Sequence, residues 1–313
     1  MLFRQLEYFV AVAREQHFAR AAAACYVTQP ALSAAIAKLE EELGVSLIYR
    51  DHAFEGLTPE GQRLVTWAQR ILAEHDAFKS EVQALQSGVT GTLRLGIIPT
   101  TSTTVALPVS AFCSVHPLAR VNLTAPSSTV ELSRRLRDFE LDAALTYSDD
   151  EPDPSLDYLP LYSERYVVVG SSSVLAGQDG EITLRETSNL PLALLSRELR
   201  SRQLIDATFA GIDVALEPQI ETGSVASLQA LVRSGRWASI IPHSWLQAEP
   251  RDGSLTVLSL SDQTLTGSVS VAIHAGNPGS LIAKEFARIA VSLRLQDVLD
   301  EQFPTREALS TGR

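Results

Sequence analysis

The sequence predicts an α/β chain of several domains, with a helical N-terminal segment and a longer C-terminal region of alternating strands and helices. Three observations carry this prediction. Two short helical patterns meet at a tight turn within 18–40, a heptad of mostly apolar residues runs over 64–85, and strand and helix patterns alternate from residue 93. With 313 residues and 45% hydrophobic side chains, the chain exceeds what one core usually organises and can fill two or three.

The patterns within 18–40 predict a helix-turn-helix. The first helix, Phe18 to about Cys25, is mostly alanine and can pack closely against a neighbour. The second follows Thr28, whose hydroxyl suits an N-cap, and has proline in its first turn. One apolar stripe then recurs at spacings of four, three and four residues: Leu32, Ile36, Leu39 and Leu43. The opposite face of this helix is left for another molecule.

That opposite face carries side chains suited to reading a major groove. Gln29 can bond bidentately to an adenine edge, Ser33 can donate or accept, and Lys38 suits a phosphate. Small alanines allow close approach to thymine methyl groups. The expected DNA contacts on this helix are Thr28, Gln29, Pro30, Ala31, Ser33, Ala34 and Lys38. The alternative is an ordinary helical hairpin whose outer face is merely solvated.

The order of features along nearly the whole chain resembles that of the LysR-type transcriptional regulators. The likeness rests on the opening helix LFRQLEYFVAVAREQHF with an apolar face, on TQPALS, on the I-x-x-L-E-x-x-L-G run from Ile36, and on LTPEG at 57–61. The face of the opening helix is Leu6, Phe9, Val10 and Ala13. The resemblance implies a winged helix-turn-helix over 1–58 (helix-turn-helix about 18–37), with its wing at about 47–58 and Arg50 near the DNA backbone.

Two features of the predicted DNA-binding segment depart from expectation. The wing carries Asp51 and Glu55 where relatives often have basic residues, and 1–58 holds five Lys and Arg against seven Asp and Glu. DNA-binding modules are normally basic. Affinity is therefore expected to depend on several copies binding at once.

A long linker helix and hinge are predicted over 59–91. The helix starts at Thr58 and Pro59, and its seam alternates spacings of four and three, with His75 as a polar member. The other members are Leu64, Ala68, Ile71, Phe78, Val82 and Leu85. The resemblance favours antiparallel pairing of this helix with a second subunit, in a homodimer or homotetramer. Packing against its own domain is the alternative.

Residues 92–313 form the predicted regulatory domain. Repeated strand–helix units imply a parallel sheet with helices on its faces. By resemblance this domain is two-lobed and periplasmic-binding-protein-like (type 2), with lobe I at about 92–162 and 267–295 and lobe II at about 163–266.

Polar clusters at the predicted strand ends indicate a ligand site. Ligands of open α/β sheets bind past the carboxyl ends of the strands, and helix N-termini attract anions. Plain N-capping is the alternative for any one hydroxyl. The expected effector contacts are Thr100, Thr101, Ser102, Ser128, Thr129, Ser196, Arg200 and Thr222. Hydroxyls with arginine suggest a small carboxylate or other anion, and the resemblance places small-molecule inducers in this cleft.

Other classes of protein are disfavoured by what the sequence lacks. It contains no G-x-S-x-G, H-E-x-x-H, P-loop or G-x-G-x-x-G pattern, and its six histidines are scattered, so neither an enzyme, a cofactor nor a metal is expected. Cys25 and Cys113 fit buried apolar positions better than a disulfide. No export signal or span of about 18 apolar residues is apparent, which disfavours a solute-binding protein and a membrane protein.

The sequence thus predicts a cytoplasmic, nucleoid-associated, effector-controlled regulator that binds double-stranded promoter DNA, a small molecule, itself and RNA polymerase. A cytoplasmic small-molecule-binding protein or an enzyme, with a helix-turn-helix used only for assembly, is the alternative.

Overall fold

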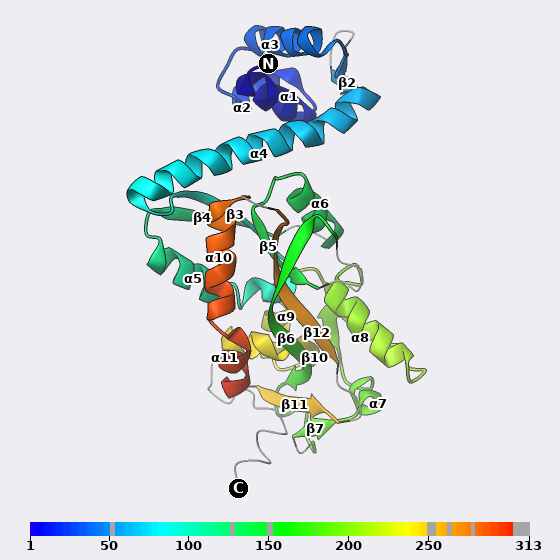
Figure 1. The fold of residues 1–313 in the computed structure, drawn as a ribbon. Coiled ribbons are helices and arrows are strands. Elements are labelled where there is room, and N and C mark those ends of the chain that lie inside the picture. Colours follow the sequence, from blue (N-terminus) through cyan, green and yellow to red (C-terminus); the bar gives the residue numbers. More distant parts are fainter. Residues whose placement is uncertain are drawn as a thin grey trace. The chain divides into compact units, whose positions relative to one another are not determined.

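The computed structural model describes residues 1–50, 54–125, 129–148, 153–178, 180–248, 255–261, 265–276 and 279–302 (Figure 1). Most of one compact unit is Met1–Gly88, and most of the other lies from Val89 onward. Each unit is described by itself below.

The first unit is a helical domain with a two-stranded wing and a long helix. Its elements are α1 (Phe3–Glu15), α2 (Phe18–Ala24), α3 (Gln29–Leu43), β1 (Ile48–Arg50), β2 (Phe54–Leu57) and α4 (Pro59–Ser87). Ala21 and Ala22 of α2 are buried against α1 and α3, as the alanine-rich pattern predicts. The stripe of α3 is buried at Leu32, Ile36 and Leu39.

Three local predictions in this unit are wrong. The buried face of α1 includes Tyr8, Ala11 and Val12, whereas Val10 and Ala13 are only half buried, because α2, α3 and α4 all pack on α1. Leu43 is 41% exposed, since α3 ends there at Gly44, whose φ of 70° is left-handed.

The third concerns Thr28, which is the N-cap residue of α3 but whose side chain makes no capping hydrogen bond. A cap hydroxyl accepts from the N–H of the second or third helical residue. The second is Pro30, which has no N–H, so one of the two donors is missing.

The wing is held to the helices around it through one carboxylate and one hydroxyl. Glu40 Oε1 accepts hydrogen bonds from the N–H groups of Leu47 (2.8 Å) and Ile48 (3.3 Å). The Thr58 hydroxyl donates to the carbonyl of Ser46 (2.6 Å) and accepts from the N–H of Gly61 (2.9 Å), which starts α4. The strands β1 and β2 are antiparallel, with Ile48 opposite Leu57. The acidic residue of the I-x-x-L-E run therefore fixes the wing rather than facing DNA.

The second unit contains an eight-stranded mixed sheet. The strands are β3 (Gly91–Ile97), β4 (Ala119–Thr124), β5 (Ala143–Tyr147), β6 (Leu156–Gly170), β7 (Glu181–Ile182), β10 (Ser239–Pro242), β11 (Thr256–Leu260) and β12 (Thr266–His274). Their order is β4-β3-β5-β12-β6-β11-β7, with β10 also paired to β6. A separate parallel pair joins β8 (Ala193–Leu195) and β9 (Ile220–Thr222).

The expectation of a parallel sheet holds only in part. Strands β3, β4 and β5 are parallel, but β12 runs antiparallel to both β5 and β6, and β10 and β11 run antiparallel to β6. The reason is that the chain crosses the unit twice, out along β6 and back along β12, in opposite directions. Strand β6 spans 15 residues and reaches from one side of the unit to the other.

Helices cover the sheets of this unit. They are α5 (Ala106–Val115), α6 (Thr129–Arg137), α7 (Leu184–Thr187), α8 (Arg200–Ala210), α9 (Val225–Arg233), α10 (Leu281–Ser292) and α11 (Leu295–Gln302), with 3-10 turns η1 (Pro99–Ser102) and η2 (His243–Ala248). The short elements α7, α11, β7 and β11 were not predicted.

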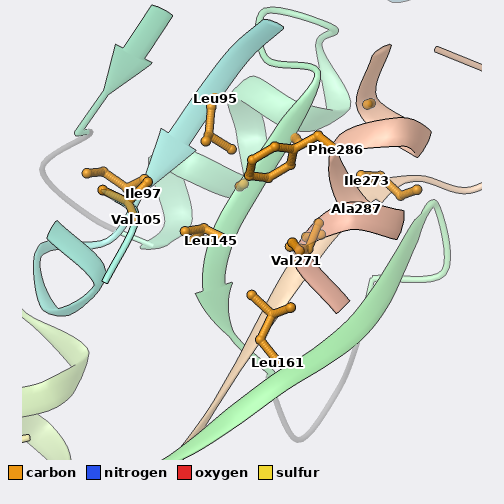
Figure 2. Packing of buried hydrophobic residues seen from close by; sticks show 14 of the residues in the cluster. Leu95, Ile97, Val105, Leu145, Leu161, Val271, Ile273, Phe286 and Ala287 are labelled. Carbon is orange, nitrogen blue, oxygen red and sulfur yellow. The ribbon is translucent and has the colours of Figure 1, made fainter. Parts of the chain in front are cut away.

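The hydrophobic core of this unit falls into three clusters. One joins β3, β5 and the start of β6 to α10, and Leu95, Leu145 and Phe286 are among its members (Figure 2). The other two lie around the end of β6, one with α8 and one with α9. Strand β6 therefore contributes to all three clusters. Its first residues belong to the cluster with α10 and its last residues to the clusters with α8 and α9, so its middle residues lie between them. None of the described helices is long and apolar enough to cross a membrane.

Candidate DNA interface and effector cavity

The outer face of α3 is open to solvent. Six of the expected DNA contacts are exposed and Ser33 is half buried; the exposed ones are Thr28, Gln29, Pro30, Ala31, Ala34 and Lys38. The side chain of Arg50 lies outside the described residues, as does the wing tip at 51–53. The fold therefore leaves exposed the face of α3 that would have to enter a major groove.

Two features near this face were missed by the sequence reasoning. Tyr26, in the turn before α3, is 95% exposed and has a left-handed φ of 55°. Such a conformation is uncommon for residues other than glycine. The place of Tyr26 in the turn of the helix-turn-helix is the feature of the sequence that could have pointed to it. The carboxylate of Glu42 is paired with the Met1 ammonium, which helps hold its pKa below the usual range.

The linker helix α4 divides into two halves with different surroundings. Ala68 is buried, and Leu64 and Ile71 pack against the core of the first unit. This half of the seam therefore packs against its own domain, which was the alternative to pairing with a second subunit. Further along, Phe78 is 68% and Leu85 is 83% exposed, and Val82 is exposed too. His75 stacks on Phe3 with ring centroids 4.1 Å apart. Only the second half of the seam is therefore left for a partner.

A cavity lies in the second unit, between η1, α6, β5 and α8. It is lined by Ile98, Pro99, Thr100, Thr129, Tyr147, Glu198, Leu199, Arg200 and Ser201. The space open to the centre of a water molecule is about 10 Å³, enough for about one water. Three expected effector residues, Thr100, Thr129 and Arg200, come together in its wall.

Four further expected effector residues, all of them described by the structure, do not line the cavity. The Thr101 hydroxyl is buried and donates to the carbonyl of Ile98 (2.9 Å), and the Ser102 hydroxyl donates to that of Pro99 (2.7 Å). The Thr222 hydroxyl accepts from the N–H of Ser224 (3.1 Å). Each of these hydroxyls bonds nearby backbone, but none of them is the N-cap of a helix, because two donate to carbonyl groups and the N-cap of α9 is Ser224.

Ser196 donates its backbone N–H to Thr222 and joins β8 to β9, while Ser128 lies outside the described residues. Thr100 does not lie at the N-terminus of an α-helix, because it sits in the 3-10 turn η1 and α5 begins only at Ala106. Tyr147 and Ser201 are lining residues that the sequence reasoning missed. Tyr147 ends a strand, and the rule for strand carboxyl ends could have found it.

The Thr100 hydroxyl is the most unusual group in the cavity wall. It is 1% exposed, and Oγ1 has no hydrogen-bond partner of ordinary geometry among the described residues. Burial raises the pKa of the Tyr147 phenol well above its usual value, and the neighbouring Thr100 hydroxyl opposes that rise. The Thr100 carbonyl accepts the indole N–H of Trp245 (2.8 Å). A buried donor without a partner costs free energy unless a ligand or water satisfies it.

Behind the cavity lies the buried carboxyl group of Glu164. Tyr147 donates its hydroxyl to Oε2 (2.7 Å) and Ser244 donates to Oε1 (3.2 Å). Burial raises the pKa of Glu164 to about 7, although both hydrogen bonds lower it. Gly267 pairs with Glu164 in the ladder of β6 and β12, and a Cβ there would lie 2.9 Å from the Tyr147 ring. The glycine thus leaves the room in which Tyr147 reaches Glu164.

Helix α8, which supplies part of the cavity wall, is anchored by a fully buried arginine. Arg202 pairs with Asp206 (2.8 Å) and Glu221 (3.0 Å) and donates to the carbonyl of Leu195 (2.9 Å). These contacts fix the start of α8 against β8 and β9. Among the described residues, no group of three or more His, Cys, Asp or Glu side chains is arranged to hold a metal.

Comparison with known proteins agrees with both halves of this description. Residues 3–62 match the family described as "Bacterial regulatory helix-turn-helix protein, lysR family", and residues 86–293 match "LysR substrate binding domain". The chain belongs to the LysR family of transcriptional regulators. It is therefore a DNA-binding, effector-binding regulator and not an enzyme.

Individual relatives of this LysR-type regulator cover nearly its full length. A probable hydrogen peroxide-inducible genes activator of Streptomyces viridosporus is 34% identical, over 93% of this chain and 92% of the relative. The regulator BbuR of Bordetella bronchiseptica is 32% identical, over 85% and 82%. The solved structure of full-length OxyR from Pseudomonas aeruginosa, with a cysteine-to-aspartate substitution, has a TM-score of 0.73 at 26% identity, covering 93% of this chain and 98% of that one. The likeness thus extends over the α/β fold with its helix-turn-helix.

Proposed function

We propose that this regulator reads its operator with the outer face of α3 and responds to a small carboxylate bound at the cavity of the second unit. The observation that carries the effector proposal is the buried Thr100 hydroxyl without a partner in the cavity wall. A ligand atom that bonds this hydroxyl would remove a cost that the empty protein carries.

The surroundings of Thr100 favour an anion. Helices α6 and α8 begin at Thr129 and Arg200, and both residues line the cavity. The free N–H groups of a helix start and its dipole attract negative charge, and the Arg200 guanidinium adds a full positive charge. The carboxylate of Glu198 also lies in the wall and is exposed. Because it repels negative charge, it disfavours a ligand with several negative charges.

Peroxide chemistry on a thiol is not favoured for this chain, despite the names of some relatives. Peroxide is detected in proteins through reactive thiolates. No cysteine lines the cavity; Cys25 belongs to the first unit and Cys113 to α5. Burial raises the pKa of the Cys25 thiol, which makes it a poorer nucleophile. A carboxylate bound by hydroxyls and N–H groups needs no such thiol.

The space at the cavity limits how a carboxylate can enter. Room for about one water is too little for several heavy atoms. Binding must therefore be accompanied by separation of the walls, which come from α8 on one side and from η1 and α6 on the other. A ligand shifts such an equilibrium by its differential affinity for the two arrangements. We take lobe I as about 92–162 with 267–295 and lobe II as about 163–266, so that the cavity lies between the lobes.

Assembly through the exposed half of α4 completes the proposal. Phe78, Val82 and Leu85 form an apolar stripe on a helix that has no partner there within its own core cluster. Burial against the same stripe of a second copy would remove this surface from water. A homodimer or homotetramer would also place on one operator several modules that each carry few basic residues. RNA polymerase is the proposed further partner, at promoters in the nucleoid.

Two measurements test the proposal. A thermal-shift screen of small carboxylates on the full chain, followed by calorimetry, should find a ligand whose affinity falls in Thr100→Val and Thr129→Val. A gel shift with DNA upstream of the gene should show a complex whose mobility or affinity changes with that carboxylate. If no carboxylate binds, the effector class is wrong. If a ligand binds equally well to both valine variants, the cavity is not its site.

A further inference from the structure

A row of hydroxyl and carboxyl groups leads from the cavity to Glu164. Thr100 stands in the cavity wall, Tyr147 lies between, and Glu164 is fully buried behind it. The Tyr147 hydroxyl is 2.7 Å from Glu164 Oε2 and 3.0 Å from the Tyr166 hydroxyl, and Tyr147 lines the same cavity as Thr100. These three groups come from different elements, η1, β5 and β6, so their alignment is a product of the fold.

The groups that face Glu164 are neutral. From β5 comes Tyr147, from β6 come Tyr162 and Tyr166, and from η2 comes Ser244. Burial raises the pKa of each of the three phenols well above the usual value, so they carry no charge near pH 7. Within the described residues, every hydrogen bond to the carboxyl comes from one of the hydroxyls of Tyr147 and Ser244.

The charged or titratable residues that adjoin Glu164 and Ser244 in the chain, Arg165 and His243, make contacts with other groups. His243 of η2 accepts from the backbone N–H of Arg165 (3.0 Å), and burial lowers its pKa to about 4, so it is neutral at pH 7. The Arg165 guanidinium pairs with Asp300 of α11 at 2.5 Å. Among the residues that the structure describes, no cation pairs with a Glu164 carboxylate, which agrees with a pKa raised to about 7.

The protonation of Glu164 determines which way the hydroxyls can point. A carboxylate only accepts, so Tyr147 must donate to it, and the lone pairs of the phenol oxygen are then left for the hydroxyls of Tyr166, at 3.0 Å, and of Thr100. Thr100 would then show only lone pairs to the cavity, which repel an anion. A protonated Glu164 can donate to Tyr147 instead. The Tyr147 O–H can then turn toward Tyr166 or toward Thr100. When it turns toward Thr100, the Thr100 O–H can donate into the cavity.

We propose that Glu164 is a positioning residue for the effector: acting through Tyr147 and Thr100, it makes the cavity accept an anion together with one proton. This inference rests on the proposed carboxylate function of the cavity and adds its coupling to a proton. The proton comes from solvent and stays on the carboxyl of Glu164, and no covalent bond to the ligand forms. The carboxyl would then also present no negative charge behind the bound anion.

The linkage predicts a defined pH dependence. A site that must hold a proton with a pKa near 7 loses affinity about tenfold between pH 6 and pH 8. The test is calorimetry on the full chain at both pH values and constant ionic strength, with acetate and benzoate as probes of two sizes and acetamide as the neutral isostere of acetate. Proton uptake is measured from the binding heats in HEPES and in Tris.

Three variants separate the possible causes. Glu164→Gln keeps the shape and resembles the protonated acid, so it should bind the carboxylate at pH 8 as the parent does at pH 6, without proton uptake. Tyr147→Phe removes the hydroxyl that joins Glu164 to the cavity and should reduce the pH dependence to less than about threefold. The Glu164 charge could then act on the bound anion only directly and from a distance, which is a smaller effect. Glu198→Gln removes an exposed carboxylate from the same wall and should keep the tenfold dependence.

The outcomes distinguish this inference from the proposal on which it rests. Carboxylate binding that is equal at pH 6 and pH 8 in the parent overturns the proton coupling and leaves the carboxylate site standing. Absence of binding by both probes at either pH overturns both. A pH dependence that survives in Glu164→Gln assigns the proton to another group. Full dependence in Tyr147→Phe removes Tyr147 from the route.

Discussion

Trp245 donates its indole N–H to the carbonyl oxygen of Thr100 across 2.8 Å and thereby joins η2 to η1. The indole is fully buried, and it fixes from behind the turn that carries the cavity hydroxyl. Two segments 145 residues apart in the sequence are thus tied at the wall of the cavity.

Trp245→Phe tests this tie. The change leaves a buried carbonyl without its donor and removes part of a large side chain, so the free energy of unfolding should fall by about 2–4 kcal/mol. Urea unfolding of the full chain measures it, with the half-buried Trp237→Phe as the matched control, which should lose less. Equal losses in the two variants would mean that the bond to Thr100 adds nothing beyond packing.

Thr100→Val should have opposite effects on stability and on binding. Valine has nearly the shape of threonine, and the hydroxyl it replaces is buried without a partner, so the empty protein should be at least as stable as the parent. Affinity for a carboxylate should fall by about 1–3 kcal/mol, as for a hydrogen bond to a charged group. Unfolding and calorimetry on one preparation give both numbers. The control Thr101→Val should destabilise, because that hydroxyl bonds the Ile98 carbonyl.

Base recognition by α3 predicts different results for two substitutions. Gln29→Ala should cost about 1–3 kcal/mol at one base pair and leave nonspecific binding nearly unchanged. Arg50→Ala should weaken all sequences about equally and flatten the salt dependence. Gel shifts on the operator and on a scrambled duplex, at several salt concentrations, compare the two. If Gln29→Ala binds the operator as tightly as the parent, Gln29 does not read a base.

Pairing through α4 is best tested on its exposed half. Ile71 packs in the core of the first unit, so charge there would disturb folding as well as assembly. Asp at both Phe78 and Val82 places charges only in the exposed stripe, where burial without partners is strongly unfavourable. Dimers should dissociate and operator affinity should collapse, as measured by sedimentation and gel shift. Lys79→Asp is the control on the same exposed turn. An unchanged oligomer in the double variant excludes this stripe from the interface.

Glu164 should make stability depend on pH in a direction opposite to that of an ordinary paired carboxylate. Its pKa is raised in the folded chain, from 4.5 to about 7, so the folded state holds the proton more tightly than the unfolded state does. Its contribution is fully present below pH 4.5 and is lost as the pH rises through 7. Relative to Glu164→Gln, the parent should therefore lose on the order of 1–3 kcal/mol between pH 5 and pH 8. Urea midpoints at both pH values measure this; parallel curves for the two proteins would place the titration elsewhere.

Local patterns were sufficient for the helix-turn-helix and the order of elements. The stripe of Leu32, Ile36 and Leu39 and the capped start of α4 at Thr58 depend on neighbours a few residues away, and both are found in the structure. The same holds for Gly61, where a Cβ would lie 2.0 Å from the Leu47 carbonyl, so that LTPEG needs its glycine. Local signals fail where several partners compete for one helix, as for the wide buried face of α1.

The candidate effector site was only partly predictable. Polar residues after strands pointed to Thr100, Thr129 and Arg200, because strand carboxyl ends meet at one edge of a sheet. The same rule also selected Thr101, Ser102 and Thr222, whose hydroxyls bond nearby backbone. Sequence gives the chemistry of a hydroxyl but not the direction in which it points.

What the sequence determined by itself is the family, the helix-turn-helix and the strand–helix order, since periodicity and short motifs encode them directly. Only the tertiary structure decided that Ile71 serves its own core while Phe78 stays exposed. It also decided that Tyr147 meets Glu164 behind the cavity. These relationships depend on burial and on contacts between strands that run in opposite directions, and no local pattern in the chain specifies them.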